Sequence, residues 1–494
     1  MHIDHNLLNR YHFMNEKKTQ QYQKLKLKFY SQTIKKNIGY KGDIRAYIGT
    51  RTWVHEKSSS EKDQSQRHNE ALQSALLDLE KILSKTQFTN ELQKALELWR
   101  IDGCNIERVP FEDTIISPPV NKIKNWKKNG RSFVSLFSGA FGLDLGFMAV
   151  GFKPLIALDI EESSCNTINT NLPKLPFFKE DVNNVTTKRV LNEIGLGVGE
   201  LDVVTGGPPC QPFSTAGKRQ SMNDPRASPL REFVRFINEA KPKCFVMEEV
   251  EGVLSARLKH IPIAERDPKA ALSPEEQPGS AFKLIMQMLN ETGYSVSYKL
   301  VNAADYGAPQ ERRRLIFIGM RDGVPELPEP SHSYVPQVRI DGQTVAPWTT
   351  FWEAAADLQG KEMEYTKFSE KISNYMRLIP PGGYWRQLPE DMVLEAMGGA
   401  HESEGGKMGY YRRLSWDCPS PTVVTTPSQK GTLLCHPEEL RPISVEEYKR
   451  VQGFPDDWKI LGSTMTKYQL IGNAVPVYLS HAIAMKVSKL LDEN

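Results

Sequence analysis

Short apolar runs alternate with amphipathic stretches along the chain from residue 132 onward. The runs SFVSLF, KPLIALDI, LDVVTGG and KCFVMEEV predict buried strands, and apolar residues recur at helical spacing after three of them. The predicted strands span 132–137, 153–160, 201–207 and 243–250, and the predicted helices span 143–151, 161–172 and 231–242. Strands that alternate with helices predict a mostly parallel sheet covered on both faces, and therefore an α/β fold.

The pattern differs on either side of this region. The first part of the chain is rich in lysine and carries one alternating stretch, YQKLKLKFY, followed by a polar loop and two helical patterns. After Gly319, prolines, tryptophans and glycines are frequent and the periodicity fades. Helical patterns return in SVEEYKRVQGF and AIAMKVSKLLDEN, which we expect to rejoin the sheet. We therefore expect a basic module at 1–110, a sheet domain at 131–330, an irregular domain at 331–436 and a segment at 437–494 that completes the sheet domain.

Composition narrows the class of protein. The 494 residues carry a net charge of only +3, so any binding of nucleic acid must come from local basic patches. The polar start, MHIDHNLLNRYHFM, does not resemble a signal peptide, and no apolar run approaches the roughly 20 residues of a membrane span. None of the six cysteines forms a C-x-x-C pair, so we expect neither a metal site nor disulfides, and a reducing cytoplasm is the simplest compartment.

Small residues follow the first predicted strand. Gly139, Gly142 and Gly146 would let the backbone approach a ligand, and Phe137 precedes the first of them. The spacing is not G-x-G-x-x-G, so it favours a cofactor with an adenosine but without phosphates. An ordinary glycine-rich turn between strand and helix is the alternative.

Acidic residues follow the next apolar runs. Asp159 ends the second predicted strand and could accept hydrogen bonds from both ribose hydroxyls, with Ile160 beside the adenine. Asp181 could accept from the adenine amino group. Each acid could instead cap a helix.

A single cysteine stands in the stretch TGGPPCQPFSTAGKRQ. Cys210 follows the C-terminal end of a predicted parallel strand, where open α/β sheets place their sites, and the prolines around it fix the direction of the thiol. Such rigidity suits a nucleophile. Lys218 and Arg219 could stabilise its thiolate or face a phosphate.

Charged residues also mark the next strand ends. Glu248 lies between apolar strand residues and a second acid, Glu249, which favours a carboxyl that keeps its proton and suits a general acid. Alternation along a strand places Arg312 and Arg314 on one side and Arg313 on the other, as a cradle for an anion or a polar base. A solvated acidic pair and a solvated basic strand end are the alternatives.

Taken in order, these motifs resemble the DNA (cytosine-5)-methyltransferase family of the bacterial restriction-modification type. FSGAFGLDLGF is similar to the family's S-adenosylmethionine loop, GGPPCQPFS to its nucleophile loop and QERRR to its Gln-x-Arg-x-Arg motif. RPISVEEYKRVQGFPDDW and YQLIGNAVPV resemble its last two blocks. The resemblance covers about residues 132–484, with a variable target-recognition region inside it.

The resemblance implies a Rossmann-like methyltransferase fold and a role for each matching residue. Cys210 would add to carbon 6 of a flipped-out cytosine, Glu248 would protonate ring nitrogen 3, and Arg314, with Arg312, would lie near the base. The residues expected at S-adenosylmethionine are Phe137, Ser138, Gly139, Gly142, Asp159, Ile160, Asp181, Val182, Pro208, Asn473 and Val475. Those expected at DNA phosphates are Gln211, Ser214, Lys218 and Arg226.

The chain departs from the family in two places. Glu249 stands where the family has an Asn, and we expect this second carboxylate to favour the protonated form of Glu248 or to slow the enzyme. Ala227 and Pro229 break the family's pattern in the loop that would close on DNA. The segments IPPGGYWRQLP, MGYYRRLSWDCPSPTVVTT and SQKG offer Arg, Gln and aromatic residues for reading bases, or form ordinary surface loops.

The sequence therefore predicts a monomeric cytoplasmic DNA (cytosine-5)-methyltransferase that acts on double-stranded DNA alongside a restriction endonuclease. Two alternatives remain at this point. One is an RNA cytosine-5 methyltransferase, and the other is a non-catalytic regulator in which residues 1–110 bind DNA.

Overall fold

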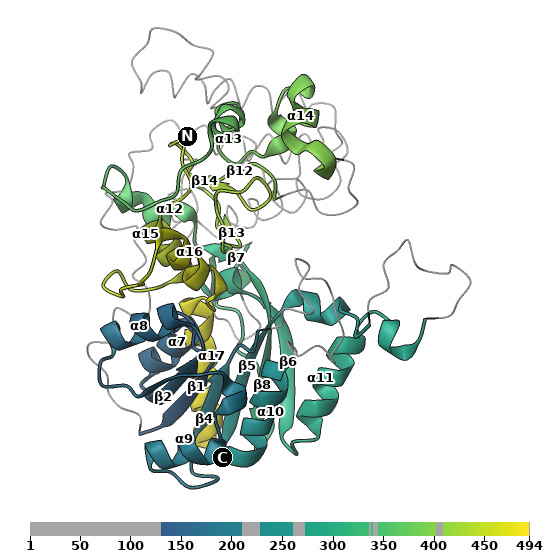
Figure 1. The fold of residues 1–494 in the computed structure, drawn as a ribbon, viewed down its shortest axis with the longest axis vertical. Helices are drawn as coiled ribbons and strands as arrows, with labels where there is room; N and C mark the ends of the chain where they lie inside the picture. Colours follow the sequence, from purple (N-terminus) through teal and green to yellow (C-terminus); the bar gives the residue numbers. More distant parts are fainter. Residues whose placement is uncertain are drawn as a thin grey trace. The chain divides into compact units, whose positions relative to one another are not determined.

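The computed structural model describes residues 130–209, 228–259, 272–334, 337–338, 344–401 and 409–493 (Figure 1). These residues form two compact units. One, here called the sheet unit, consists of the described residues of 130–330 and 452–493, and the other, the second unit, is Ser331–Val451. The basic module expected at 1–110, with its strand and helices, lies outside the described residues.

A seven-stranded sheet in the order β3-β2-β1-β4-β5-β8-β6 is the centre of the sheet unit. The first five strands in this order are parallel, whereas β8 runs antiparallel to both β5 and β6. The strands are β1 (Ser132–Leu136), β2 (Lys153–Asp159), β3 (Phe177–Lys179), β4 (Val203–Gly206), β5 (Cys244–Val250), β6 (Ser295–Asn302) and β8 (Arg313–Met320). The expected α/β fold with a mostly parallel sheet is confirmed, although strands β3 and β6 were not predicted.

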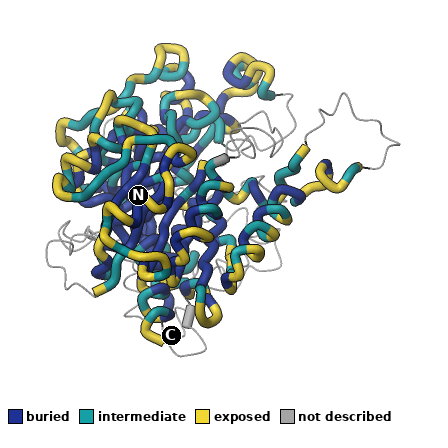
Figure 2. The backbone as a smooth tube through the Cα atoms, turned by 60° about the horizontal axis from the view of Figure 1, so that its bottom comes forward, coloured by how far each residue is buried: buried dark blue, intermediate teal, exposed yellow. Residues whose placement is uncertain are grey.

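Helices cover both faces of the sheet. Figure 2 shows the buried segments of the chain in dark blue. Val134, Val204 and Phe245 point to one face, where they form a continuous apolar core with α9, α10 and α11. On the other face, Phe133 contacts Phe147 of α7, with ring centroids 5.7 Å apart. The helices are α7 (Gly142–Val150), α8 (Glu162–Asn171), α9 (Thr187–Ile194), α10 (Ser228–Ala240), α11 (Ser280–Asn290), α16 (Thr464–Asn473) and α17 (Val477–Glu493).

Helix α17 packs closely against α7, although the two are far apart in the sequence. A Cβ atom at Gly146 would overlap the Ser480 side chain and the His481 backbone, and one at Gly142 would overlap the Val475 carbonyl oxygen. These glycines were expected to let a ligand approach. The structure shows that both allow close packing of α7 against the C-terminal segment, and a contact of Gly142 with a ligand stays a prediction.

The stretch Thr464–Glu493 is long and apolar enough to cross a membrane by length and composition. Its most apolar window is 72% buried inside the protein, and Pro476 separates it into α16 and α17. No apolar run of this length was expected from the sequence. The burial of the window identifies it as part of the core of the sheet unit.

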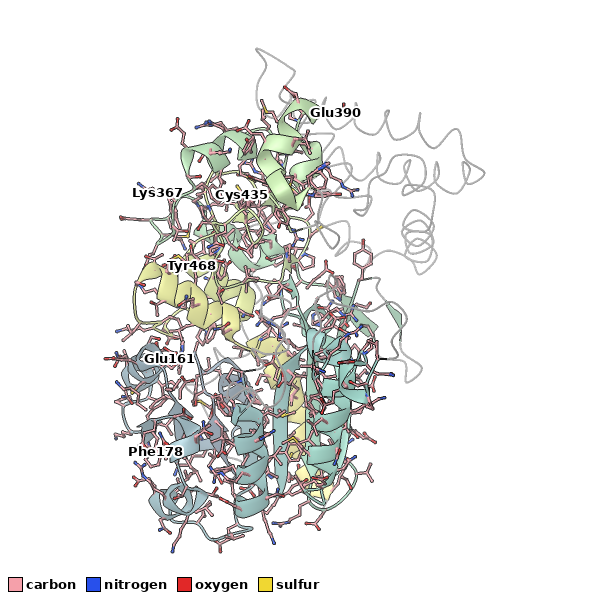
Figure 3. The ribbon with its side chains drawn as sticks, turned by 45° about the vertical axis from the view of Figure 1, so that its right-hand side comes forward. Glu161, Phe178, Lys367, Glu390, Cys435 and Tyr468 are labelled. Carbon is pink, nitrogen blue, oxygen red and sulfur yellow. The ribbon has the colours of Figure 1, made fainter. Side chains whose placement is uncertain are left out.

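The second unit is built from short elements around its own apolar core. Tyr375, Trp385, Met397, Tyr411 and Cys435 belong to this core, and Cys435 is labelled in Figure 3. Its regular elements are β9 (His332–Ser333), β10 (Gln337–Val338), β11 (Thr344–Pro347), α12 (Phe351–Ala355), α13 (Glu370–Met376), α14 (Glu390–Met397), β12 (Arg412–Arg413), β13 (Ser420–Pro421), β14 (Leu434–Cys435) and α15 (Val445–Gln452).

Buried charges extend the second unit beyond the boundary expected at residue 436. Arg441 donates two hydrogen bonds to the Glu447 carboxylate at 2.8 and 3.0 Å, and both side chains are buried. Arg450 of α15 pairs with Asp357 at 3.1 Å. These contacts hold the segment up to Val451 inside the second unit, so most of α15 does not rejoin the sheet unit as expected.

Candidate functional site

The C-terminal ends of the five parallel strands meet at one edge of the sheet. The chain enters at β1 and adds β2 and β3 on one side, then adds β4 and β5 on the other side. The strand order therefore reverses between β1 and β4, and ligands of open α/β sheets bind beside such a point. The predicted site residues of the described chain lie on both sides of it.

The turn after β1 has an unusual backbone. Phe137, Gly139 and Phe141 have φ values of 57°, 52° and 74°, in the left-handed region that is costly for residues other than glycine. The Ser138 amide and hydroxyl both donate to the Leu158 carbonyl at 3.0 Å, which ties the turn to β2. A Cβ atom at Gly139 would meet nothing within 4 Å, so this turn borders open space.

Asp159 links this turn to the end of β2. Its carboxylate accepts from the Gly139 amide at 2.8 Å and from the Glu161 amide at 2.9 Å. Burial raises the pKa of the Asp159 carboxyl, while these two hydrogen bonds act in the opposite direction. Ile160 beside it is 61% exposed, and Glu161, labelled in Figure 3, is the N-cap residue of α8. An acid fixed by two amides next to an exposed apolar side chain fits the ribose and adenine of a nucleoside.

Asp181 acts as a helix cap, the alternative considered from the sequence. It accepts from the Asn183 amide at 2.9 Å and begins the short helix η4 (Val182–Asn184), in which Val182 is buried. The cap fixes the direction of the carboxylate at the end of β3. This position, after the strand that follows Asp159, still agrees with a contact to a nucleoside base.

A buried polar cluster lies beneath the turn, and the sequence analysis missed it. Thr205 of β4 donates to the Asp144 carboxylate of α7 at 2.9 Å, and the Ser135 hydroxyl donates to that of Ser138 at 3.0 Å. Burial raises the pKa of Asp144 to about 7, although hydrogen bonds from Ser135 and Thr205 lower it. The cluster joins β1, α7 and β4. Ser135 and Thr205 were not recognised because each reads as an ordinary strand residue.

Glu248 and Arg314 form an ion pair on the other side of the site. The Arg314 Nε and Glu248 Oε1 atoms lie 2.7 Å apart, and both side chains are largely buried. Gly207, just after β4, lies so close that a Cβ atom there would be 3.1 Å from Glu248 Oε2. The structure therefore brings the turn before Cys210 next to this ion pair.

The neighbouring charges differ from the expected cradle. Arg312 is only 2% exposed, and its Nη2 donates to the Gly472 carbonyl at 2.9 Å, so it holds the protein backbone.

The residues next to the Glu248–Arg314 ion pair in the sequence point away from it. Arg313 lies on the outer side, as expected, with an exposed ion pair to Glu251 at 3.2 Å. Glu249 is buried and follows Glu248 along the strand, so its side chain points to the opposite face of the sheet. The expected effect of Glu249 on Glu248 or on the rate of the enzyme stays a prediction.

The remaining predicted residues divide into two groups. Pro208 is buried beside Gly207, and the turn that carries Asn473 and Val475 lies against the N-terminus of α7 through Gly142. Cys210, Gln211, Ser214, Lys218 and Arg226 lie outside the described residues. Among the described residues, no group of three His, Cys, Asp or Glu side chains could hold a metal ion.

Several residues considered for reading bases are core residues of the second unit. Trp385, Tyr411, Arg413 and Trp416 are all less than 9% exposed. Arg413 donates to the carbonyls of Ile379 and His436 at 3.0 and 3.2 Å. These four side chains hold the second unit together.

A mostly parallel sheet with helices on both faces, whose strand order reverses between β1 and β4, defines a Rossmann-like α/β fold. Residues 131–489 match the family described as C-5 cytosine-specific DNA methylase. The chain belongs to this family. It is thus a DNA (cytosine-5)-methyltransferase, which confirms the class of enzyme expected from the sequence motifs.

Curated relatives are similar over most of their length. The type II methyltransferase M.PspPI of a Psychrobacter species is 38% identical over 73% of this chain and 80% of its own. M.Eco47II of Escherichia coli is 34% identical over 79% and 85%, and M.Sau96I of Staphylococcus aureus is 32% identical over 75% and 79%. All three are type II methyltransferases, the modification enzymes of restriction-modification systems.

Proposed function

We propose that this enzyme uses Cys210 to activate a flipped-out cytosine in a short duplex sequence and methylates carbon 5 of the base. The observation that carries the proposal is the position of Gly207 against the Glu248–Arg314 ion pair. Gly207 precedes Cys210 by only three residues in the sequence, which supports a role for this cysteine together with the carboxylate and the guanidinium. A nucleophile, an acid and a cation at one strand edge match the needs of addition to a ring carbon.

The residues around the turn after β1 fit S-adenosylmethionine as the methyl donor. Asp159 would accept from the ribose, and the exposed Ile160 would cover the adenine. S-Adenosylmethionine supplies an electrophilic methyl group when it is bound. The other residues proposed to hold it are Phe137, Ser138, Gly139, Asp181, Val182, Pro208, Asn473 and Val475.

The side chains of the protein would prepare the base for this methyl group. The Cys210 thiolate forms a bond to carbon 6, and Glu248 gives a proton to ring nitrogen 3, so carbon 5 becomes nucleophilic. After methylation, carbon 5 loses its proton to a base, the bond from sulfur to carbon 6 breaks to release the thiolate, and ring nitrogen 3 returns its proton to Glu248. Arg314 orients Glu248 and faces the same base, while Arg312 acts through the backbone that it holds.

The DNA would contact two parts of the chain. Gln211, Ser214, Lys218 and Arg226 are proposed to bind the phosphates around the flipped base, and residues 331–436 to recognise the target sequence. We further propose that the enzyme acts as a monomer in the bacterial cytoplasm and protects DNA from a partner restriction endonuclease. The type II relatives support this pairing.

Expression in a bacterium without DNA methylation, followed by bisulfite sequencing, tests the activity. Methylcytosine at one short motif is expected, and its absence with a folded protein would favour a regulator. Methylcytosine in RNA alone would favour the RNA enzyme.

DNA carrying 5-fluorocytosine tests the nucleophile. Fluorine cannot leave carbon 5 as a proton does, so an adduct that survives SDS should form with the wild type. The Cys210→Ser variant should form none, and an equal yield from it would assign the nucleophile to another residue.

A further inference from the structure

The turn that carries Asn473 and Val475 is held by side chains from distant segments. Helix α16 ends at Asn473, and the last carbonyl groups of a helix need donors from outside it. Gln452 Nε2 donates to the Ile471 and Ala474 carbonyls at 2.6 and 3.0 Å. Arg312 Nη2 donates to the carbonyl between them, that of Gly472, at 2.9 Å.

Gln452 is itself fixed by a second buried amide. Gln310, which lies just before Arg312, donates from its Nε2 to the Gln452 Oε1, and both glutamine side chains are completely buried. Gln452 thus uses both N–H donors and its carbonyl oxygen inside the protein. A buried amide satisfied in this way has one orientation, because turning it over would bring its oxygen against two carbonyl oxygens.

The same turn contacts the nucleoside-binding side of the site. The Val475 carbonyl oxygen lies against Gly142, at the start of α7 and three residues after Gly139. Arg312, on its other side, is two residues from Arg314, which pairs with Glu248. The turn therefore connects the two halves of the site through buried contacts within the sheet unit.

We infer that Gln452 is a positioning residue that sets the turn 473–475 against S-adenosylmethionine. It acts through backbone carbonyls and does not touch the cofactor. Arg312 assists by holding Gly472, which couples the turn to the strand that carries Arg314. This inference rests on the proposed binding of S-adenosylmethionine beside Asn473 and Val475.

Gln452→Glu is the sharpest test, because it replaces two N–H donors by carboxylate oxygens at nearly constant volume. The Ile471 carbonyl keeps the Ala474 amide as a donor, but both carbonyls lose their hydrogen bond from Gln452. This loss weakens the arrangement by about 1–3 kcal/mol, so the Kd for S-adenosylmethionine should rise about 5- to 150-fold. Isothermal titration of the full-length protein with S-adenosylmethionine measures this Kd. The KM for S-adenosylmethionine should rise in parallel, whereas the KM for DNA should change less than about twofold.

Gln287→Glu is the matched control. Gln287 lies on α11 in the same unit and forms an exposed hydrogen bond with Glu291, so the same chemical change should leave the Kd unaltered. If Gln452→Glu does not fold, Gln310→Leu is the second variant. It removes only the hydrogen bond that Gln310 donates to Gln452, so it should also raise the Kd for S-adenosylmethionine, but by a smaller factor.

The outcomes separate this inference from the proposed function. A wild type that does not bind S-adenosylmethionine would overturn the proposed cofactor site. A wild type that binds and methylates, with folded Gln452 and Gln310 variants whose Kd is unchanged, would overturn the positioning role alone. A lower melting temperature with an unchanged Kd would likewise assign Gln452 to stability only.

Discussion

The Arg314 guanidinium lies 2.7 Å from the Glu248 carboxylate, across two antiparallel strands. Val250 pairs with Arg314 in the β-ladder, so Glu248 lies two residues away on the same face. The pair holds the carboxylate at the sheet edge beside Gly207. It gives Glu248 a fixed direction before any base arrives.

Glu248→Gln should abolish most methyl transfer while the protein still folds and binds DNA. An amide has the same shape, but it cannot give up a proton as an acid does, and general acids typically contribute about 10²- to 10⁴-fold in rate. Transfer of a radioactive methyl group to DNA measures the rate. Glu251→Gln is the control, because Glu251 forms an exposed pair with the adjacent Arg313. Equal rates for the two variants would remove Glu248 from the mechanism.

Gly146→Ala should destabilise the sheet unit. Its new methyl group would overlap Ser480 and the His481 backbone, which cannot move without separating α17 from α7. Overpacking of this kind costs about 1–3 kcal/mol in the free energy of unfolding, measured by urea denaturation. Gly197→Ala is the control, because its methyl group would meet only the flexible end of Glu200 at 3.3 Å. Equal stability of both variants would contradict close packing of these helices.

Asp144→Asn should change how stability depends on pH. Burial raises the pKa of Asp144 from 3.8 to about 7, so the folded state holds this proton more tightly than the unfolded chain. The stability that the protonated group contributes is full below about pH 4 and is lost as pH rises to about 7. The amide of the Asp144→Asn variant cannot ionise, so the variant does not lose this stability as the pH rises.

The free energy of unfolding of the Asp144→Asn variant should therefore rise relative to wild type by on the order of 1 kcal/mol per pH unit between about pH 5 and 7. Denaturation series at several pH values measure the difference. Asp322→Asn, at an exposed position, should follow the wild-type profile. Parallel profiles for Asp144→Asn and wild type would show that Asp144 does not titrate in this range.

Glu447→Gln should destabilise the second unit. Glu447 is 1% exposed and accepts from Arg441, so the substitution removes the buried counter-charge of this guanidinium and leaves only the more exposed Glu439 beside it. Breaking a buried pair costs about 3–5 kcal/mol, which hydrogen exchange of the core amides would detect. Glu395→Gln breaks the exposed pair with Lys371 and should cost less than about 1 kcal/mol. If both substitutions lowered the free energy of unfolding by a similarly small amount, the buried pair would not stabilise the second unit.

Much of the sheet could be predicted because its strands are apolar runs that precede helices of clear period. Strands β1, β2, β4 and β5 follow this rule. Strand β3 does not, because its two half-buried phenylalanines and exposed Lys179 form a strand only by pairing with β2 at the sheet edge. No local pattern distinguishes them from a loop.

The site shows the same division. Asp159 and Glu248 could be found because each ends an apolar run. The packing role of Gly142 could not be found, because its partner Val475 lies far along the chain. In a sequence, a glycine that makes room for a ligand cannot be distinguished from one that makes room for a helix. The same holds for Gln310 and Gln452, which are separated by 142 positions.

The packing of α17 on α7 has a consequence for synthesis of the protein. Ribosomes add about 5–20 residues per second, so residues 321–476 delay the arrival of α17 by roughly 8–30 seconds after β8 has been made. One face of the nascent sheet stays without this cover during that time, and the turn at 473–475 does not yet exist. The growing chain must therefore be kept from aggregating, and it gains the ability to modify DNA only when its last helix leaves the ribosome.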